Sequence, residues 1–445
     1  MNYYSLLQAR AAESRPVRVG LIGAGKFGAM FLSQALHTRG LHVLGIADLD
    51  VARARDQLAR TGWPLERYAA PSFERALADG STFITDDAAA LIAADGIDVI
   101  VEATGVPEAG IAHALKCFAD ARHVVMVNVE ADALAGPLLA RRAAQAGVVY
   151  CMAYGDQPAL IAEQVDWARA CGFQVISAGK GTRYLPAYHA STPDTVWDHY
   201  GLSAEQAASA GMNAKMFNSF LDGTKSAIEM AAVANACDLT PAPHGLTFPP
   251  CGINQLADVL RPKSAGGVLH HEGQVEVISS LHRDGREVER DLRWGVFISF
   301  EAPSDYVERC FGEYGVTTDG TGRYSVLYRP FHLIGLELGI SVISAAVLGQ
   351  PTGVATGFRG DVAATAKRDL AAGEVLDGEG GFCVYGKLMP AAESLKGGYL
   401  PMGLASGVKL KAAIPVGQSL RFTDVDIDET APAVAFRREM EAAFT

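Results

Sequence analysis

The sequence is short of cysteine and of basic residues, and each shortage excludes a class of protein. Seven cysteines are scattered through 445 residues with no Cys-x-x-Cys pair and no His/Cys spacing of the zinc-site type, so we expect reduced thiols and no disulfide framework. Lysine and arginine together number 38 against 50 for aspartate and glutamate, which gives a net charge of −12. Because no basic cluster is present to neutralise phosphates, the chain is not expected to bind nucleic acid.

The sequence also lacks an uninterrupted hydrophobic stretch. The beginning of the chain has no apolar segment of the kind that a secretory signal carries, so we expect a cytoplasmic protein. The longest apolar run, residues 331–349, contains Glu337, and a carboxylate is costly inside a bilayer. This run is predicted to be a buried helix, and no membrane partner is expected.

A parallel sheet is predicted for the first third of the chain. Between residues 17 and 152, short β-branched runs alternate with alanine-rich amphipathic segments. Apolar strands that alternate with helices indicate a sheet covered on both faces. The predicted fold class is therefore α/β, with a Rossmann-like, doubly wound parallel sheet in residues 1–153.

Two further domains are expected after this sheet. Residues 154–354 mix helices with alternating polar and apolar runs, and Asp284-Gly285 between two such runs predicts a two-residue hairpin. This region is expected to be an α+β catalytic domain, whose last helix can pack back on the first domain. Residues 355–445 contain short segments broken by glycine and proline and then a helix, which predicts a small β-rich domain.

A glycine-rich turn links the first predicted strand to the first predicted helix of the sheet. Gly23, Gly25 and Gly28 form a Gly-x-Gly-x-x-Gly motif, with Lys26 and Phe27 inside it. The first glycine permits the tight turn, the second lets the backbone approach a pyrophosphate, and the third lets helix and strand pack closely. The helix N-terminus offers free N–H groups to the phosphates. We predict that these five residues bind a dinucleotide; the alternative is a plain tight connection.

Asp48 ends the second predicted strand, 20 residues after Gly28, where a carboxylate accepts hydrogen bonds from the adenosine ribose. It favours NAD(H), because a carboxylate repels the 2′-phosphate of NADP(H). Arg53 and Arg55 follow on the next helix, from which an arginine can reach a phosphate. NADP(H) and NAD(H) therefore both stay open as cofactors.

The ends of the fourth and fifth predicted strands supply further candidates, since ligands of open α/β sheets bind at the carboxyl ends of the strands. Cofactor contacts are predicted for Thr104, Gly105 and Asn128. Glu130 is a candidate substrate contact. The alternative is that these residues only turn the chain or cap the next helix.

Basic residues beside glycines or small residues are the first candidates in the second domain. Lys180 and Arg183 lie in a Gly-Lys-Gly-Thr-Arg sequence at a strand end, where a ligand can come close. Lys180 is a candidate proton donor, and Arg183 can clamp an anion with two hydrogen bonds. Arg329 and His332 precede the long apolar run and are candidate substrate contacts, although a histidine at such a place is often a core residue.

Residues 213–230 are predicted to carry the reactive edge of the second domain. Asn213 at their start is a candidate substrate contact, and Asp222 is placed to cap a helix. On that helix Lys225 and Glu229 are four residues apart and share a face, so a carboxylate could hold an ammonium for proton transfer. We predict that Lys225, Glu229, Asp222 and Lys180 are catalytic; the alternative for the first two is an exposed ion pair.

These motifs resemble a known family. GLIGAGKFG, GIAD, VEATGVP and VNVEAD look like the nucleotide domain of homoserine dehydrogenases and related oxidoreductases. A narrower group, the homoserine-dehydrogenase-like proteins described as 1-deoxy-D-xylulose 5-phosphate reductoisomerase-like, is similar in residues 155–158, 179–183, 219–230 and 328–337. Residues 366–376 and 416–425 are similar to SAF domains, which are small β-clip modules.

The resemblance implies an oxidoreductase that uses a nicotinamide cofactor on a small polyhydroxylated, possibly phosphorylated, carbonyl compound. The activity type of the narrower group is NADPH-dependent conversion of 1-deoxy-D-xylulose 5-phosphate to 2-C-methyl-D-erythritol 4-phosphate, a step of isoprenoid biosynthesis. A catabolic sugar or sugar-acid dehydrogenase and an NAD(P)-sensing, sugar-binding regulatory protein are the alternatives. We expect a homo-oligomer that binds a small-molecule substrate, and no metal site, because no carboxylate cluster has a suitable spacing.

Overall fold

The computed structural model describes residues 2–209 and 212–444. They divide into two compact units, and each unit joins segments that are far apart in the sequence. The first unit comprises Met1–Leu160 and His332–Val354, and the second comprises Ile161–Phe331 and Ala355–Thr445.

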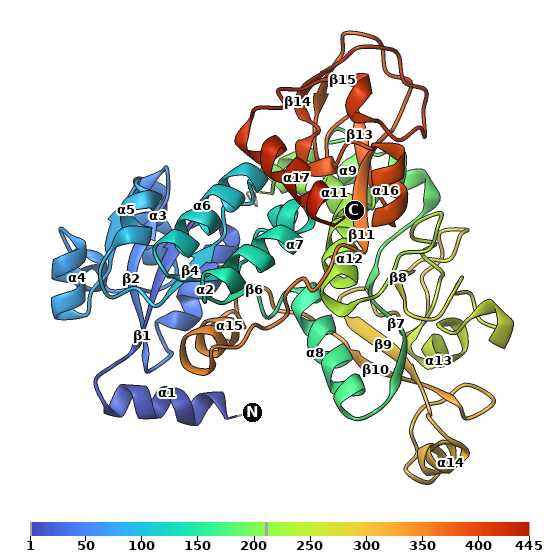
Figure 1. Cartoon of the computed structure of the whole chain (residues 1–445), viewed down its shortest axis with the longest axis horizontal. Helices are drawn as coiled ribbons and strands as arrows, with labels where there is room; N and C mark the ends of the chain where they lie inside the picture. Colours follow the sequence, from blue (N-terminus) through green and yellow to red (C-terminus); the bar gives the residue numbers. More distant parts are fainter. Residues whose placement is uncertain (1, 210–211, 445) are drawn as a thin grey trace. The chain divides into compact units, whose positions relative to one another are not determined.

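A six-stranded parallel sheet forms the centre of the first unit (Figure 1). The strand order is β3-β2-β1-β4-β5-β6, so the chain starts in the middle and winds outward to both edges. Nearly all strand residues are buried, as expected when helices cover both faces. The predicted Rossmann-like sheet is confirmed. Its strands are β1 (Val17–Ile22), β2 (Leu41–Ala47), β3 (Phe83–Thr85), β4 (Val99–Glu102), β5 (His123–Met126) and β6 (Tyr150–Met152).

The helices of the first unit begin at residues that suit helix starts. The side chains of Asp50, Ser72 and Asn128 each accept a hydrogen bond from a backbone N–H of the first turn, and Pro107 opens another helix. These helices are α1 (Tyr3–Ala12), α2 (Lys26–Ala35), α3 (Val51–Arg60), α4 (Phe73–Asp79), α5 (Ala88–Ala93), α6 (Pro107–Ala119), α7 (Val129–Gln145) and α15 (Gly339–Ile343).

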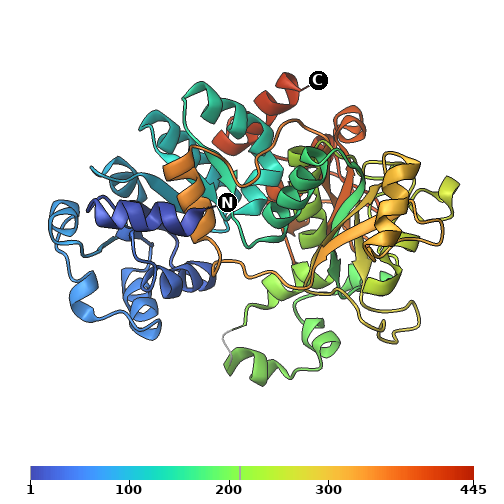
Figure 2. The ribbon, with the colours of Figure 1, turned by 90° about the horizontal axis from the view of Figure 1, so that it is seen from below.

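The long apolar run returns to the first unit. Its helix α15 continues into one turn of π-helix, η5 (Ser344–Leu348), and Leu338, Val342 and Ala345 are buried in the same core as β1 and β2. Figure 2 shows this orange segment beside the dark blue helix α1. Among the described residues, no helix is long and apolar enough to cross a membrane.

A four-stranded mixed sheet, in the order β10-β9-β7-β8, lies in the second unit. The central strand β7 (Gln174–Thr182) pairs in parallel with β8 (Gln274–Ser279) and antiparallel with β9 (Val296–Glu301), and β10 (Tyr324–Arg329) pairs antiparallel with β9. The hairpin predicted at Asp284-Gly285 does form: Leu281 and Glu287 make an antiparallel bridge, and the His282 N–H donates to the Arg286 carbonyl at 2.8 Å. It stays short, because the runs on its two sides continue as β8 and β9, which lie on opposite sides of β7.

The glycines of β7 explain this arrangement. A Cβ atom at Gly179 would lie 1.7 Å from the carbonyl oxygen of Glu276, and one at Gly181 would lie 1.9 Å from the carbonyl oxygen of Leu292. Only glycine lets the chain come this close on either side of the strand. The Gly-Lys-Gly sequence is thus required by packing.

Helix α12 (Thr224–Cys237) is the buried helix of the second unit. Twelve of its 14 residues are buried, and β7, β8, β11 and β13 all lie against it. The side chain of Asn235 accepts hydrogen bonds from the backbone N–H groups of Arg359 and Gly360, at 2.7 and 3.0 Å. The remaining helices are α8 (Gln157–Ala170), α9 (Val196–Tyr200), α10 (Ala204–Ser209), α11 (Ala214–Leu221), α13 (Leu256–Val259), α14 (Asp305–Glu313), α16 (Ala391–Gly397) and α17 (Pro432–Ala443).

The C-terminal residues form small antiparallel sheets that belong to the second unit. One pairs β11 (Gly360–Ala366) with β13 (Val384–Pro390), and the other contains β12 (Val375–Asp377), β14 (Ser406–Leu410) and β15 (Val425–Asp426). The last helix, α17, inserts the fully buried Arg437, whose guanidinium binds both carboxylate oxygens of Asp361 on β11. The likeness to a SAF domain stays a prediction.

Short 3₁₀ helices complete the fold: η1 (Leu65–Tyr68), η2 (Pro186–Ala190), η3 (Ile253–Gln255), η4 (Lys263–Ala265), η6 (Met402–Leu404) and η7 (Phe422–Asp424).

Candidate active site

The glycine-rich turn between β1 and α2 has the geometry of a pyrophosphate cradle. Gly23 has φ +94°, and a Cβ there would meet the backbone of Ala103 at 2.7 Å. At Gly28 a Cβ would meet the carbonyl oxygen of Gly23 at 2.4 Å, which accounts for the close approach of helix to turn. At Gly25 a Cβ would meet nothing within 4 Å. Gly23 thus permits the turn, Gly28 permits the close packing of the helix, and Gly25 leaves the open space that a ligand needs.

Lys26 and Phe27, the two residues between Gly25 and Gly28, differ in their exposure to solvent. Lys26 is exposed at the first position of α2, and Phe27 is half-buried against the core of the first unit. The N-cap of α2 is Gly25, which has no side chain, so the first N–H groups of the helix receive no side-chain cap. These N–H groups remain available to an anion.

Asp48 holds the glycine turn in place. Its buried carboxylate accepts hydrogen bonds from the N–H groups of Ala24 and Asp50, at 2.8 and 2.9 Å, and from the guanidinium of Arg53 at 2.7 Å. The Arg53 side chain is half exposed, whereas Arg55 donates to the carbonyl of Tyr68 at 3.4 Å. Arg53 therefore neutralises the Asp48 carboxylate. This weakens the predicted repulsion between that carboxylate and the 2′-phosphate of NADP(H).

The residues after β4 and β5 interact with one another. The Thr104 hydroxyl donates to Oε1 of Glu102 at 2.5 Å, and the Asn128 amide donates to the Val106 carbonyl at 2.9 Å. Asn128 also caps α7, so the capping alternative describes the contacts it makes here. Gly105 has φ +69° with open space at its Cβ position, and Glu130 is half-buried on the first turn of α7.

In the second unit, Lys180 and Glu229 form a buried ion pair. Lys180 extends from β7 and Glu229 from α12, and their side chains are 6% and 4% exposed. The sequence predicts that Glu229 holds Lys225 on its own helix; in the structure the carboxylate oxygen Oε2 of Glu229 binds the ammonium of Lys180, a partner that the sequence reasoning did not assign to it. The reason is that β7 lies against this face of α12, which local helix spacing cannot show. Lys225 is half-buried one turn before Glu229.

A second buried ion pair joins Asp222 to Lys367. The ammonium lies 2.7 Å from Oδ2 of Asp222 and also donates to the carbonyls of Ser191 and Gly381, at 2.8 and 2.7 Å. Burial raises the pKa of Asp222, against the opposing effect of Lys367. Asp222 accepts a hydrogen bond from the Thr224 N–H at 2.8 Å, so it supports the start of α12 as predicted. The sequence reasoning missed Lys367, because it lies 145 residues from its partner.

The other predicted substrate contacts lie in several places. Arg183, just past β7, has a buried Nε atom with no hydrogen-bond partner among the described residues. Asn213 caps α11 by accepting from the Met216 N–H at 3.2 Å. Arg329 ends β10 and lies over the ring of Phe331 at 4.7 Å, and His332 is half-buried in the first unit. Of these residues, Arg183 keeps the clearest capacity to bind an anion.

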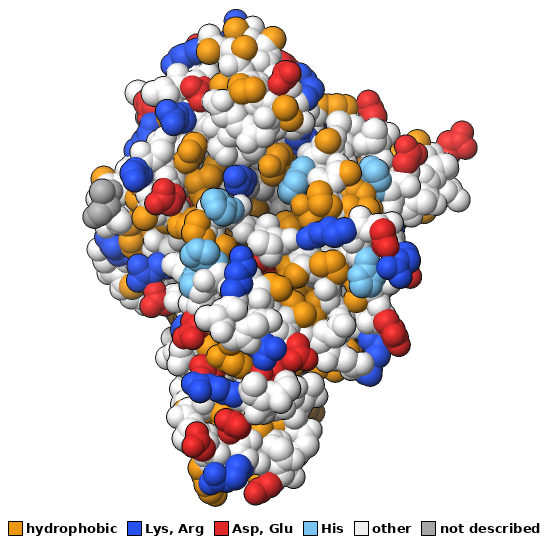
Figure 3. All heavy atoms as spheres, turned by 90° about the vertical axis from the view of Figure 1, so that its right-hand side faces the viewer, with side chains coloured by type: hydrophobic (Ala, Val, Ile, Leu, Met, Phe, Trp, Pro, Cys, Tyr) orange, Lys and Arg blue, Asp and Glu red, His pale blue; other side chains and the backbone are white. Residues whose placement is uncertain are grey.

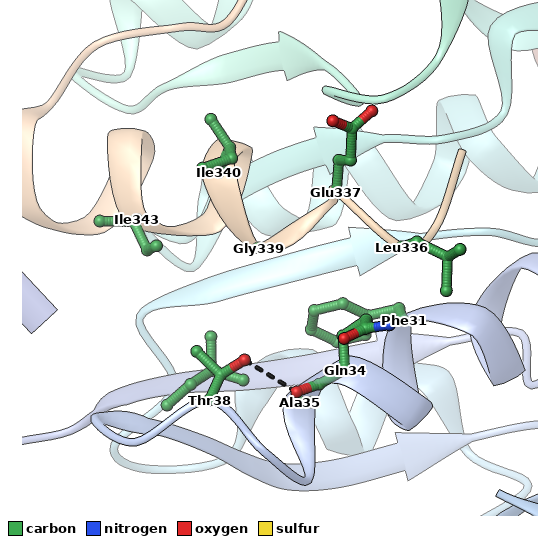
Figure 4. A pocket seen from close by; sticks show the side chains of 10 residues that line it. Phe31, Gln34, Ala35, Thr38, Leu336, Glu337, Gly339, Ile340 and Ile343 are labelled. Carbon is green, nitrogen blue, oxygen red and sulfur yellow. Dashed lines mark hydrogen bonds between the residues drawn. The ribbon is translucent and has the colours of Figure 1, made fainter. Parts of the chain in front are cut away.

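The first unit also contains a cavity of about 310 Å³, between α2 and the segment that leads into α15 (Figure 4). Phe31, Leu336 and Ile340 are among its lining residues, and Thr38 donates to the Gln34 carbonyl at 2.8 Å. Phe31 and Gln34 lie in the later part of α2, and Leu336 and Ile340 come from the segment around α15, whereas the glycine turn precedes the start of α2. The cavity is therefore separate from the predicted dinucleotide site.

Comparison with known proteins gives one family match. Residues 155–338 match a family model described as "Oxidoreductase DRL, catalytic domain". The matched segment includes Lys180, Asp222 and Glu229 but neither the glycine turn nor Lys367. The match confirms the oxidoreductase class predicted from the sequence, for the residues that it covers. The comparison with curated protein sequences found no significant match.

A comparison with solved structures finds several that are similar to part of this chain. One is myo-inositol dehydrogenase from Lactobacillus casei with NAD(H) and myo-inositol (15% identity, TM-score 0.29, 41% of this chain and 50% of that chain). Another is an oxidoreductase from Agrobacterium radiobacter with NAD⁺, L-tartaric acid and magnesium (18%, 0.29, 38% and 44%). A third is a probable dehydrogenase from Thermotoga maritima (13%, 0.39, 76% and 91%). The match covers half of the length of the first of these proteins and less than half of the second.

Proposed function

We propose that the chain is an NAD(P)-dependent dehydrogenase that acts on a small polyhydroxylated compound. The observation that carries this proposal is the buried ion pair of Lys180 and Glu229, which lies inside the segment similar to an oxidoreductase catalytic domain. Reduction of a carbonyl places negative charge on its oxygen, and the oxygen must receive a proton. A buried ammonium held by a carboxylate can supply both the charge and the proton.

Each residue has a distinct role in this proposal. Lys180 donates a hydrogen bond and then the proton to the substrate oxygen, or accepts the proton in the oxidative direction. Glu229 positions the ammonium and keeps it charged in a buried setting. Arg183, with its unpartnered Nε, binds a carboxylate or phosphate of the substrate.

The cofactor would be held by the first unit. The open space at Gly25 and the uncapped N-terminus of α2 fit a pyrophosphate, and Asp48 with Arg53 lies at the end of β2, where the adenosine ribose is expected. When bound, the nicotinamide supplies or accepts the hydride. NAD(H) and NADP(H) both fit this site, because Arg53 neutralises Asp48.

The finer hypothesis, a 1-deoxy-D-xylulose 5-phosphate reductoisomerase-like activity, shares the hydride step and adds a rearrangement of the carbon skeleton. Ordinary reductoisomerases use a metal-binding carboxylate cluster. In residues 2–209 and 212–444, no group of three His, Cys, Asp or Glu side chains is arranged to hold a metal ion. A sugar or sugar-acid dehydrogenase requires no such cluster, so we favour the dehydrogenase.

A substrate screen tests the proposal. The full chain is incubated with NAD⁺ or NADP⁺ and a panel of polyols, sugars, sugar acids and sugar phosphates, and the absorbance of the reduced nicotinamide is followed. Gly25→Val, which fills the open space of the cradle, is the matched blank. We expect at least one compound to be oxidised by the natural protein and not by the variant.

A second arm separates the two enzyme hypotheses. 1-Deoxy-D-xylulose 5-phosphate is supplied with NADPH, with and without Mg²⁺ and EDTA. Turnover of 1-deoxy-D-xylulose 5-phosphate and of no other compound would contradict the dehydrogenase hypothesis and support the reductoisomerase hypothesis. Cofactor binding without turnover of any compound would contradict both and favour a sensor of NAD(P).

A further inference from the structure

A second cavity, of about 230 Å³, lies within the second unit between α12 and β13. Residues from the middle of the chain and from its C-terminal part line it together, among them His189, Gly223, Ala227, His244, Tyr385 and Lys387. It is a different cavity from that of Figure 4. The cavity exists because the C-terminal residues pack against α12. These C-terminal residues are predicted from the sequence to form a separate domain.

The His189 wall of this cavity is fixed by hydrogen bonds. The ring nitrogen Nδ1 of His189 lies 2.7 Å from the Asp222 carbonyl, and Nε2 lies 3.0 Å from the Tyr184 hydroxyl. Because a carbonyl only accepts, Nδ1 carries the proton and Nε2 accepts from Tyr184. The His189 ring also stacks on Tyr385, with ring centres 4.4 Å apart. Burial lowers the pKa of His189, in agreement with a neutral ring.

The loop that contains Leu246 and Phe248 also lines the cavity, and it is held in place by hydrogen bonds and ring stacking. The buried Glu276 accepts hydrogen bonds from the backbone and hydroxyl of Thr247, at 3.0 and 2.7 Å. The guanidinium of Arg283 donates to the carbonyls of Thr247 and Phe248, at 2.7 and 2.9 Å. The ring of Phe248 stacks on Tyr184, with centres 3.8 Å apart. The cavity is therefore preformed by contacts that do not depend on a ligand.

Three polar groups on the lining have no hydrogen-bond or ion-pair partner in the part of the chain that the structure describes. They are the ammonium of Lys387, the hydroxyl of Tyr385 and the ring of His244. All three can donate hydrogen bonds, and none of the described lining residues is acidic. Figure 3 shows a face of the molecule on which histidine side chains lie among lysine, arginine and apolar side chains.

The cavity is distinct from the ion pair proposed for catalysis. The cavity is lined by Gly223, the N-cap of α12, and by Ala227 in the first turn of this helix. Glu229 is two residues beyond Ala227, which places it about 200° around the helix. The two features therefore lie on opposite faces of the same buried helix.

We propose that this cavity binds a small sugar-like oxyanion, a sugar phosphate or a sugar acid, at a second site apart from Lys180 and Glu229. Lys387 supplies the positive charge for the phosphate or carboxylate, and Tyr385 and His244 donate to its oxygens. Phe248 and its apolar neighbours face the carbon skeleton. The volume admits only a compact molecule. This proposal goes beyond the dehydrogenase function and does not depend on it.

Calorimetric titration of the full chain tests the second site without any need for turnover. The probes are inorganic phosphate, ribose 5-phosphate and gluconate, which separate a phosphate from a carboxylate ligand. At least one probe should bind saturably to the natural protein. Lys387→Met should weaken that binding about tenfold or more, and Lys396→Met, which removes an exposed lysine of α16, should leave it unchanged.

Two further variants decide where the probe binds. Leu246→Trp should abolish the binding by filling the cavity from its loop wall, at an unchanged circular dichroism spectrum. Lys180→Met should retain it. The proposal would be overturned by the absence of saturable binding of all three probes, by equal losses in Lys387→Met and Lys396→Met, or by loss of binding in Lys180→Met alone.

Discussion

The two units of the molecule bury charge in different ways. In the first unit the sheet is almost wholly apolar, and the pair of Lys116 and Asp120 on α6 and its end keeps both partners near solvent. In the second unit, nearly or fully buried pairs are found among the described residues, such as Lys180 with Glu229, Asp222 with Lys367 and Asp361 with Arg437. Buried pairs are costly to break, because the remaining charge has no water.

The difference teaches where the two parts of the proposed site come from. The cofactor cradle proposed in the first unit is made mainly of backbone, in a single turn between β1 and α2. The candidate catalytic groups of the second unit are side chains brought together by long-range packing. Changes in the first should therefore act on cofactor binding, and changes in the second on turnover and stability.

The largest effect is expected from Glu229→Gln. Without the carboxylate, the buried ammonium of Lys180 loses its counter-charge, so turnover should fall about a thousandfold and the free energy of unfolding by about 3 kcal/mol. Asp120→Asn, which breaks the partly exposed pair with Lys116, is the matched control and should cost less than about 1 kcal/mol. Steady-state kinetics and chemical denaturation measure both. Equal effects of the two variants would remove the distinction between the units.

Gly25→Val should come next in size. Its branched side chain would fill the open space at the turn, so the dissociation constant of NAD(P)H should rise about a hundredfold, by calorimetry. Gly312→Val, at another glycine with open space, on α14 of the second unit, is the control and should leave cofactor affinity unchanged. Unchanged affinity in Gly25→Val would show that the cradle has been assigned to the wrong turn.

Arg53→Gln should have a smaller and selective effect. The change leaves the Asp48 carboxylate without its cation, so affinity for NADP⁺ should fall about tenfold while affinity for NAD⁺ changes little. Fluorescence titrations of both nucleotides measure the ratio. Equal losses for the two would mean that Arg53 only supports the turn.

The smallest effect concerns Asp132, which is buried on α7 and accepts a hydrogen bond from the Tyr150 hydroxyl at 2.8 Å. Burial raises the pKa of Asp132 to about 6 from its ordinary value of 3.8. The folded state therefore becomes less stable as pH rises from about 4 through 6, because the buried carboxyl must ionise. Asp132→Asn should raise the melting temperature by a few degrees at pH 8 and not at pH 4. A gain that is independent of pH would contradict this account.

Local patterns predict the first unit well for a physical reason. Each strand of the parallel sheet is a short apolar run, and the order of strands follows from the alternation with helices. The glycine motif is equally local, since one turn contains all its members. The detail that local reasoning misses is that Asp48 is tied to Arg53 and to the Ala24 N–H, because this depends on the exact path of the turn.

The second unit shows what local patterns cannot give. Helical spacing predicts only the neighbour Lys225 as a partner of Glu229, and it does not predict the ion pair with Lys180, 49 residues away. The alternating runs around Asp284 predict a hairpin, which forms only next to its turn, because β7 lies between the strands β8 and β9 that the two runs continue into. In both cases the distant strand β7 makes a contact that local spacing does not predict. It supplies Lys180 to Glu229, and it separates β8 from β9. Such contacts depend on topology, which the order of residues alone does not reveal.

The most direct test of the account is a paired measurement on Lys180→Met. Methionine keeps the length of the side chain and removes its charge and proton. With the substrate found in the screen, kcat should fall about a thousandfold while the dissociation constant of the nicotinamide cofactor stays within about twofold of the natural value. A kcat within about threefold of the natural value, in a variant that is folded and binds cofactor, would contradict the proposed role of the Lys180–Glu229 pair.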